Sequence, residues 1–450
     1  MAANKFFTIS LLKEKSTYAT LLLSFTLILC SGIATIAQTK KNKHQIIAIN
    51  AAEISTGTNS KAIINVTIIN GLGGEPLTEG CVLIKDGKIQ EVGKMSDVSI
   101  PAAAEITDAS GMYLLPGFID SHFHLDRTKG LPAKFLQHGV TSIRDPGAWI
   151  ESYDEERKSG KKIPRLFLTG PHFDMPPPAY PYDAYIVRDN YEAIKQVNAL
   201  ADQGATALKI YFRVPPGMIQ AICSTAHQRG IPVTAHLEIT EAMIAIEAGL
   251  DGVEHITSFG LSLLPKREGE KYRQGMLADN NFRKPGRYNM WKDININSAA
   301  ADSLSRYLVR KGTFVSPTLG PFEYQASNGP VDSAKLSGFN NMKAMTAKFN
   351  KAGVRLVLGS HSMIPYAEEG WAYQREMELW VESGIPNTRV IMGATIENAR
   401  YFRIDDRLGS IEKGKIADLV LLKENPLTDI KATRNIGKVM LNGVWVASGE

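Results

Sequence analysis

Residues 114–126 of this 450-residue chain read LLPGFIDSHFHLD, a short apolar stretch that ends in a His-x-His pair. On a β-strand, residues two apart point to the same side, so His122 and His124 aim two imidazoles at one place. Two neutral imidazoles at a strand end suit a zinc-type ion, which accepts nitrogen ligands at about 2.0–2.1 Å. Two half-buried histidines on an edge strand would give the same pattern. The metal interpretation therefore needs further ligands from the rest of the chain.

After His124, short apolar segments typical of strands alternate with helical or undecided stretches as far as residue 358. Glycines such as Gly204 and Gly353 end several of the helical stretches. Repeated βα units favour a parallel sheet, and eight of them favour a closed (β/α)8 barrel, a TIM barrel of the α/β class. The eight predicted strands begin at Phe118, Val140, Arg165, Thr206, Val233, Gly252, Thr313 and Val354.

Strand signals also lie on both sides of the predicted barrel. Asp86-Gly87 separates two apolar segments, and Asn442-Gly443 does the same near the end of the chain; both dipeptides are typical of tight β-hairpins. We expect the two terminal segments to meet in a small β-sandwich domain. The predicted boundaries are 61–114 and 406–450 for the sandwich and 115–405 for the barrel.

The N-terminal residues indicate export. Lysines precede an apolar run from Leu21 to Cys30, and small residues follow as far as Ala37. This layout predicts a signal peptide at 1–37, a flexible lead-in at 38–60, and a periplasmic or secreted protein with no stable membrane span after cleavage. Two alternatives stay open. One is a single membrane anchor, for which the run is short, and the other is a lipoprotein signal that ends at Cys30.

Composition limits the classes of partner. The net charge is +5, and the basic residues form no stripe and are not interleaved with aromatic residues, which argues against nucleic acid. A small-molecule or peptide-like substrate is expected, and a homo-oligomer is left open. Cys81 and Cys223 are predicted to be buried thiols, because a core of this size needs no disulfide staple.

Three further residues fall at the carboxyl ends of predicted strands, the face on which TIM barrels build their sites. They are Lys209, His236 and His255, and with His122 and His124 they predict a centre for one or two zinc-type ions. An ammonium group repels metal ions, so Lys209 needs its own explanation. Burial lowers the pKa of a lysine, and the free amine can take up carbon dioxide to give a carbamate able to bridge two metals. An ion pair at the barrel mouth explains this lysine equally well.

Several motifs resemble the amidohydrolase superfamily, in particular its imidazolonepropionase-like and prolidase-like members. The similar stretches are 116–124 (the first metal motif), 139–145 (the second strand), 208–211 (the strand of the carbamylated lysine) and 394–420 (the C-terminal block). The resemblance runs from about Ala62 to the end of the chain. It implies two zinc-like ions, a bridging hydroxide and hydrolysis of amide or related bonds. It also implies that His236 and His255 are the ligands of strands five and six, and that Tyr211 contacts the substrate.

One position departs from the family pattern. The family ends its eighth strand with Gly-Thr-Asp, whereas residues 358–362 read LGSHS, with His361 in place of the aspartate. A neutral imidazole can bind metal through one nitrogen or act as a base, but it brings no negative charge. Three interpretations follow: an enzyme that uses His361 as ligand or base, a slow enzyme, or a metal-binding protein without catalysis. Asp145, Glu238 and Asp174 are candidate substitutes for the missing carboxylate.

These observations predict an exported, metal-dependent amidohydrolase that cleaves a C–N bond in a dipeptide, an N-acyl amino acid or a cyclic amide. The predicted metal-binding residues are His122, His124, Lys209, His236 and His255, and the predicted catalytic residues are His361 and Tyr211. The alternative is a catalytically impaired or non-catalytic barrel that binds metal or ligand, because His361 replaces the usual aspartate.

Two segments that follow barrel strands are expected to shape a substrate pocket. One is the proline-rich loop at 172–182, and the other is a long polar insertion at 257–295. Four histidines away from predicted strand ends are interpreted as loop or surface residues: His44, His138, His172 and His227.

Overall fold

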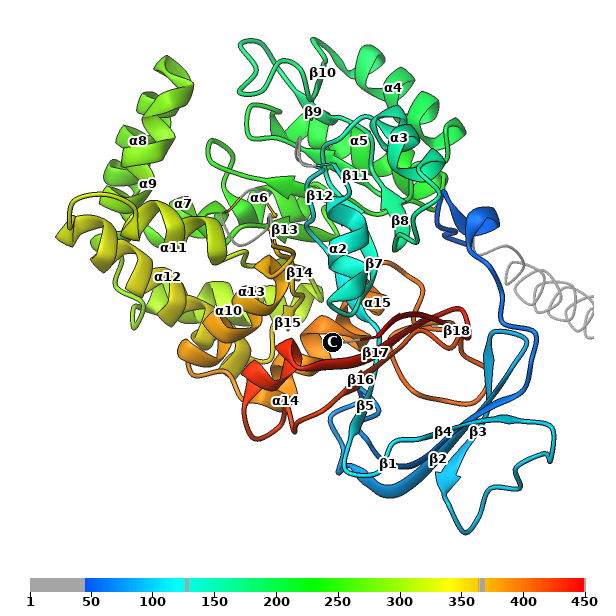
Figure 1. The fold of residues 1–450 in the computed structure, drawn as a ribbon. Helices are drawn as coiled ribbons and strands as arrows, with labels where there is room; N and C mark the ends of the chain where they lie inside the picture. Colours follow the sequence, from blue (N-terminus) through cyan, green and yellow to red (C-terminus); the bar gives the residue numbers. More distant parts are fainter. Residues whose placement is uncertain (1–44, 126–128, 363, 365–368, 449–450) are drawn as a thin grey trace, which may run out of the picture. The chain divides into compact units, whose positions relative to one another are not determined.

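A TIM barrel forms the larger part of the fold (Figure 1). The computed structural model describes residues 45–125, 129–362, 364 and 369–448. All eight predicted barrel strands are present, and they pair in parallel, so the (β/α)8 prediction is confirmed. They are β6 (Phe118–Asp120), β7 (Val140–Asp145), β8 (Arg165–Leu168), β11 (Leu208–Ile210), β12 (Val233–His236), β13 (Gly252–Glu254), β14 (Phe314–Ser316) and β15 (Arg355–Leu356).

Backbone hydrogen bonds close the ring of strands at two places. The Thr206 N–H donates to the Leu168 carbonyl at 2.9 Å, which joins the end of β8 to the start of β11. The Ser121 N–H donates to the Leu358 carbonyl at 3.1 Å, which joins the ends of β6 and β15. Two extra parallel strands, β9 (His172–Asp174) and β10 (Ala184–Ile186), extend the sheet beside β11.

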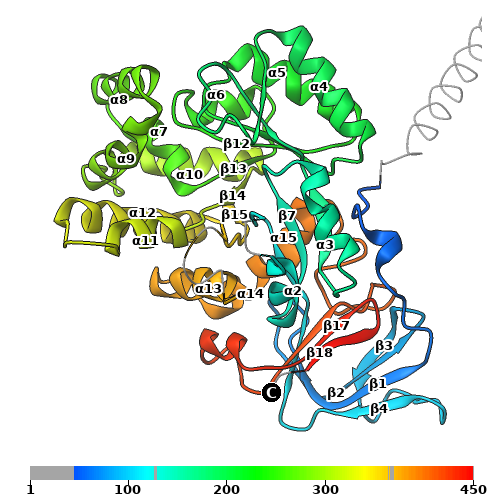
Figure 2. The ribbon, with the colours of Figure 1, turned by 45° about the horizontal axis from the view of Figure 1, so that its top comes forward.

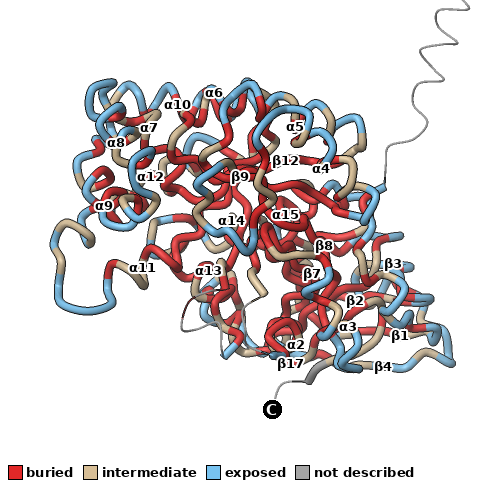
Figure 3. The backbone as a smooth tube through the Cα atoms, turned by 90° about the horizontal axis from the view of Figure 1, so that it is seen from above, coloured by how far each residue is buried: buried red, intermediate tan, exposed pale blue. Residues whose placement is uncertain are grey.

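Helices surround these strands (Figure 2). α10 illustrates why they form: Ser298 caps its N-terminus by accepting from the Ala301 N–H, Leu304 and Leu308 are buried, and Gly312 ends it with a left-handed φ of 66°. Buried backbone is concentrated along the strands, and exposed residues lie mainly on outer helices and loops (Figure 3). The helices are α2 (Leu131–Gln137), α3 (Asp154–Lys158), α4 (Asn190–Asp202), α5 (Pro216–Gln228), α6 (Ala242–Glu247), α7 (Gly260–Leu263), α8 (Lys266–Ala278), α9 (Arg283–Lys292), α10 (Ala299–Lys311), α11 (Gly320–Ser327), α12 (Ser333–Ala352), α13 (Ala372–Glu382), α14 (Asn387–Ala394) and α15 (Ile396–Tyr401).

The two terminal segments meet in one eight-stranded sheet. Backbone hydrogen bonds join the two segments of the predicted sandwich domain, because β16 (Leu419–Leu422) from the C-terminal segment pairs antiparallel with β5 (Tyr113–Pro116). The expected boundary between residues 114 and 115 falls inside β5, whose last residue is Pro116. The strands are β1 (Lys61–Ile68), β2 (Leu77–Lys85), β3 (Lys88–Lys94), β4 (Glu105–Asp108), β5 (Tyr113–Pro116), β16 (Leu419–Leu422), β17 (Ile436–Leu441) and β18 (Val444–Ser448).

Both predicted hairpins are confirmed. Asp86 and Gly87 have φ values of 51° and 70°, and Asn442 and Gly443 have 53° and 76°. Two successive positive φ values are what a two-residue type I′ turn requires, and they match the right-handed twist of the flanking strands.

The predicted lead-in differs from the structure over its described part. Ile46 and Ala48 are buried and pack in an apolar cluster with barrel and α15 residues. The buried Asn50 side chain donates to the Pro164 carbonyl and accepts from the Leu166 N–H at 2.9 Å each. This segment is therefore fastened to the start of β8 by polar contacts that alternation of residue types does not reveal.

The structure tests the predicted buried thiols but not the predicted signal peptide. Cys81 and Cys223 are free and buried, as predicted. The predicted signal peptide at 1–37 lies outside the described residues. Within the described part of the chain, no helix is both long and apolar enough to cross a membrane.

A buried ion pair links the barrel to the terminal sheet. The Arg165 guanidinium donates to the Asp418 carboxylate at 2.7 and 3.1 Å, and both residues are buried. We expect Arg165→Met to lower the free energy of unfolding by about 3 kcal/mol, because it leaves the Asp418 charge buried without its cation. The midpoint of urea unfolding measures this. Lys129→Met is the control, since its exposed pair with Glu155 should leave the midpoint unchanged; equal shifts for both variants would contradict the prediction.

Candidate metal and substrate site

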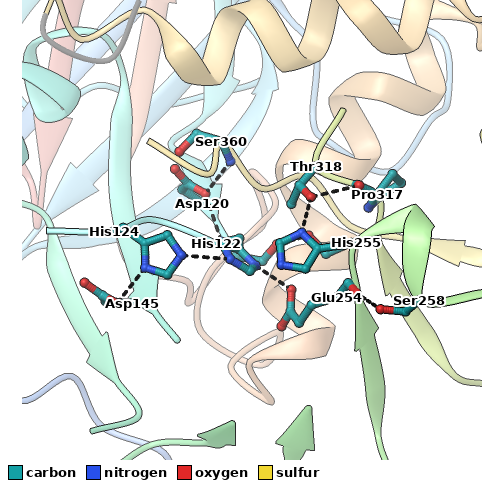
Figure 4. Close-up of polar contacts among 12 residues, drawn as sticks. Asp120, His122, His124, Asp145, Glu254, His255, Ser258, Pro317, Thr318 and Ser360 are labelled. Atoms are coloured by element: carbon teal, nitrogen blue, oxygen red, sulfur yellow. Dashed lines mark hydrogen bonds and ion pairs between the residues drawn. The ribbon is translucent and has the colours of Figure 1, made fainter. Parts of the chain in front are cut away.

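The His-x-His pair lies where β6 ends, inside the barrel mouth (Figure 4). The Asp120 carboxylate accepts the backbone N–H groups of His122 at 3.0 Å and Ser360 at 2.9 Å, which fixes this turn against the loop after β15. The Nε2 atoms of His122 and His124 lie 3.1 Å apart. Two nitrogens bound to one tetrahedral zinc are separated by about 3.4 Å, so this spacing suits ligands of a shared ion.

His361 contributes a third imidazole to the pair. One ring nitrogen from each of His122, His124 and His361 lies within 4.8 Å of the other two. The His361 N–H donates to the His122 carbonyl at 2.6 Å, so the backbones of the two ligand-bearing turns are joined directly. The His361 Nδ1 is buried, and no described residue forms a hydrogen bond with it. A buried, unpartnered nitrogen beside two other imidazoles is the donor arrangement expected of a metal site.

Carboxylates contact the His122 and His124 rings at Nδ1, the nitrogen that does not face the shared space. His122 Nδ1 lies 2.7 Å from Glu254 Oε2, and His124 Nδ1 lies 3.4 Å from Asp145 Oδ1. A histidine that donates one N–H to a carboxylate presents its other nitrogen as a lone pair in a fixed direction. Both rings therefore turn Nε2 toward the shared space.

The other predicted ligands line the same pocket. The His255 ring lies 4.7 Å from the His122 ring and 4.5 Å from the His236 ring, measured between centroids. Lys209 is buried on β11 and also faces the pocket. The structure thus brings together all five predicted metal-binding residues and His361.

Burial favours the neutral form of four of these imidazoles, those of His122, His236, His255 and His361. It lowers the pKa of His122 to about 3 and that of His236 to about 4, and it holds the pKa values of His255 and His361 well below the usual range. Burial also lowers the pKa of Lys209 to about 8, against the opposing attraction of Glu254. A divalent ion requires neutral imidazole nitrogens, so the donor set fits such an ion.

Backbone strain is concentrated around this site. His255, Thr318 and His361 have φ values of 65°, 48° and 46°, a region that residues other than glycine seldom occupy. The Thr318 hydroxyl also contacts His255 Nδ1 at 2.6 Å. Strained residues gather where the surrounding fold fixes a functional geometry.

The imidazoles open into a cavity of about 230 Å³. The 172–182 loop and the 257–295 insertion both contribute to its lining, through Tyr180 and through Arg283, Lys284 and Arg287. The insertion is helical rather than an extended loop, since α7, α8 and α9 lie within it.

The interpretation of His172 as a loop or surface residue is wrong. It begins β9, it is buried, and it lines the cavity with its ring 4.6 Å from the Tyr211 ring. Within the described part of the chain its Nε2 has no hydrogen-bond partner, and burial lowers its pKa to about 3. By contrast, His138 is partly buried, His227 is exposed, and both lie outside the cavity lining, whereas His44 is not among the described residues.

Tyr211, predicted to contact substrate, faces the cavity with its ring 4.8 Å from the His236 ring. Its hydroxyl accepts a hydrogen bond from Arg283 at 2.5 Å. Of the candidate carboxylates, Glu238 contacts His236 Nε2 at 2.8 Å. Asp174 instead accepts the backbone N–H groups of Met175, Ala179 and Arg213, and it is not among the residues that line the cavity.

Sequence reasoning missed Glu254, Asp120 and Arg283. Glu254 immediately precedes His255, and an acidic residue inside an apolar barrel strand was a usable signal for a buried partner. Asp120 offered the same signal two residues before His122. Arg283 had no such signal, because it lies in a polar insertion among other charged residues.

The fold and the site together define a TIM-barrel protein with a candidate divalent-metal centre at the carboxyl ends of its strands. Residues 113–446 match the amidohydrolase family, and the chain belongs to that family.

Similar proteins include adenine deaminases and a dipeptidase. The Moorella thermoacetica adenine deaminase is 24% identical over 90% of this chain and 60% of its own length. The Listeria welshimeri adenine deaminase is 40% identical over 18% of this chain and 14% of its own length. The chain thus spans at most about three-fifths of these relatives. A solved Xaa-Pro dipeptidase with methionine bound in its active site has a TM-score of 0.68 at 21% identity, covering 87% of this chain and all of the other, which shows a shared fold.

Proposed function

We propose that this protein is a divalent-metal-dependent hydrolase that cleaves an amide-type C–N bond. The observation that carries the proposal is the group of three imidazole nitrogens within 4.8 Å of one another, at the end of the strands and open to a cavity. Membership of the amidohydrolase family supports the reaction class.

The residues that would hold one or two ions, zinc in our proposal, are His122, His124, Lys209, His236 and His255, with His361 beside them. A bound ion would polarise the scissile carbonyl and lower the pKa of a water molecule toward about 7. Carbamylation of Lys209, in which its amine nitrogen forms a bond to carbon dioxide and loses a proton, is part of the proposal and is supported by the residue's burial among the imidazoles.

The chain's own groups prepare the site for this chemistry. Glu254 and Asp145 fix the tautomers and directions of His122 and His124. The Tyr211 hydroxyl accepts from Arg283, so its own hydrogen is free to donate to a substrate oxygen. The Nδ1 of His361, which no described residue contacts by a hydrogen bond, can bind the ion or accept a proton from the attacking water.

The alternative is a catalytically impaired or non-catalytic barrel that binds metal or ligand. His361 in place of the family's aspartate is the observation that favours it, because imidazole supplies no negative charge near the reacting water.

Metal analysis of the purified protein, coupled to a hydrolysis screen, tests the proposal. The screen contains dipeptides, N-acyl amino acids, cyclic amides and adenine, the last because adenine deaminases are among the relatives. We expect at least one tightly bound divalent ion per chain and hydrolysis of one compound class that stops when the ion is chelated and returns on its addition. Metal without turnover of any class would favour the non-catalytic barrel. Absence of metal from the protein, with activity intact, would contradict the proposal.

Export to the periplasm or outside the cell remains part of the proposal, on the strength of the residues before Ala37.

A further inference from the structure

Arg283 is a cation in the cavity wall that Glu238 attracts only from beyond ion-pair distance. It is buried and lies at the start of α9, and among the described residues no carboxylate forms an ion pair with it. Arg287, one turn along the same helix and equally buried, donates to Glu238 at 2.7 Å. A buried guanidinium usually has an anion beside it, so the unpaired one points to an anion that is not part of the chain.

Two tyrosines complete a cluster of donors around Arg283. Its two Nη atoms donate to the hydroxyl oxygens of Tyr211, at 2.5 Å, and Tyr180. Each hydroxyl that accepts from arginine keeps its own hydrogen to donate elsewhere, and a guanidinium carries five N–H groups. The remaining N–H groups of Arg283 and the two O–H groups are therefore all donors. A group that only accepts hydrogen bonds complements them, and a planar carboxylate matches the fork of a guanidinium.

The other charges of the cavity favour an anion as well. Arg287 is neutralised by Glu238, and Asp145 is occupied by His124 and by the Tyr153 hydroxyl at 2.8 Å. Lys209 and Lys284 add further cations to the lining, and the remaining acid is Asp183; of these three, Lys284 and Asp183 are exposed.

We propose that Arg283, Tyr180 and Tyr211 bind a carboxylate of the substrate, so that the preferred substrates are amides with a free carboxylate close to the scissile bond. The contacts of Tyr211 limit how far this carboxylate can lie from the scissile bond. The Tyr211 ring lies 4.8 Å from the His236 ring and its hydroxyl contacts Arg283, so the bound carboxylate would lie on the side of the cavity next to His236. N-acyl amino acids and dipeptides belong to this class, whereas neutral cyclic amides and adenine do not. The inference rests on the proposed function for the bond that is cleaved, but not for the anion that is bound.

Matched pairs of compounds test the inference. Each N-acetyl amino acid or dipeptide in a panel is compared with its C-terminal primary amide, which removes only the negative charge. We expect the wild-type protein to prefer the acid by at least about 30-fold in kcat/KM, the effect of leaving one partner of a buried charge pair unmatched. Arg283→Met should remove this preference, because it should lower kcat/KM for the acid much more than kcat/KM for the amide.

Three further variants separate recognition from folding. Arg283→Lys should restore part of the preference, because a point charge replaces the fork. Tyr180→Phe removes one donor from a ring that is 45% exposed, and it should weaken acid binding several-fold without disturbing the fold. Lys292→Met removes a positive charge from the far end of α9 and should change kcat/KM for neither the acid nor the amide. Equal losses on acid and amide in Arg283→Met would overturn the inference.

Calorimetric binding of the same acids and amides distinguishes failure of the inference from failure of the proposed function. Binding of acids that is lost in Arg283→Met, in a protein that hydrolyses nothing, would support the anion site and contradict the hydrolase. Hydrolysis with no difference between acids and amides would support the hydrolase and contradict the anion site. If the wild-type protein neither binds nor hydrolyses any acid, the anion site is overturned.

Discussion

His122→Ala should purify without the divalent ion of the wild-type protein and should lose at least about 1,000-fold in kcat/KM, since the bound ion supplies several kcal/mol of the stabilisation of the reacting charge. His122 is placed for this role more firmly than any other ligand candidate. Its Nε2 lies 3.1 Å from that of His124, Glu254 holds its other nitrogen, and its ring centroid lies within 5.0 Å of the rings of His255 and His361. Metal stoichiometry by mass spectrometry and single-substrate kinetics measure the two effects.

Glu254→Gln tests the same ligand with a smaller expected loss of metal affinity. It keeps His122 but weakens the carboxylate contact that orients the ring, so the affinity for metal should fall by about 10- to 100-fold rather than vanish. His138→Ala is the matched control, because this partly buried histidine stacks on Trp371 outside the cavity. Full metal occupancy in His122→Ala, or an equal loss of metal in the His138 control, would refute the assignment of His122.

The strand-end histidines could be predicted because the barrel itself brings them together. Once eight βα units were recognised, His122, His236 and His255 had to meet at the same face, whatever the loops did. Residues in the connections carry no such constraint. His172 follows a strand within a proline-rich stretch, and only the pairing of β9 with β11 directs it into the cavity. Arg283 depends on how the helices of the 257–295 insertion pack, which local sequence does not determine.

Polar contacts over long sequence distances limited the prediction of the fold in a similar way. Asn50 fastens the segment before β1 to Pro164 and Leu166, although nothing in its neighbours distinguishes it from a loop asparagine. The hairpins at 86–87 and 442–443 were predictable because their requirement for positive φ is met by the two residues of the turn themselves.

His361→Asp should lower kcat/KM at least about tenfold and weaken metal binding, although it restores the residue type of the family. The backbone permits the exchange, because aspartate is among the residues that tolerate the φ of 46° at this position. The side chains do not favour it. The His361 ring stacks on that of His122 at 5.0 Å and packs edge-on to that of His124 at 4.8 Å, so a shorter carboxylate leaves the third nitrogen position empty.

The new charge is also poorly accommodated, since Asp120, Asp145 and Glu254 are already buried around the imidazoles. His361→Asn separates the two causes, because it has the size of aspartate without the charge. If the shape of the ring matters most, the Asp and Asn variants should lose similar amounts of metal affinity and activity; if the charge matters most, only the Asp variant should lose activity. A rise in kcat/KM above the wild-type value in His361→Asp alone would mean that the histidine impairs the site, and the catalytically impaired barrel would then be the better description of the wild-type protein.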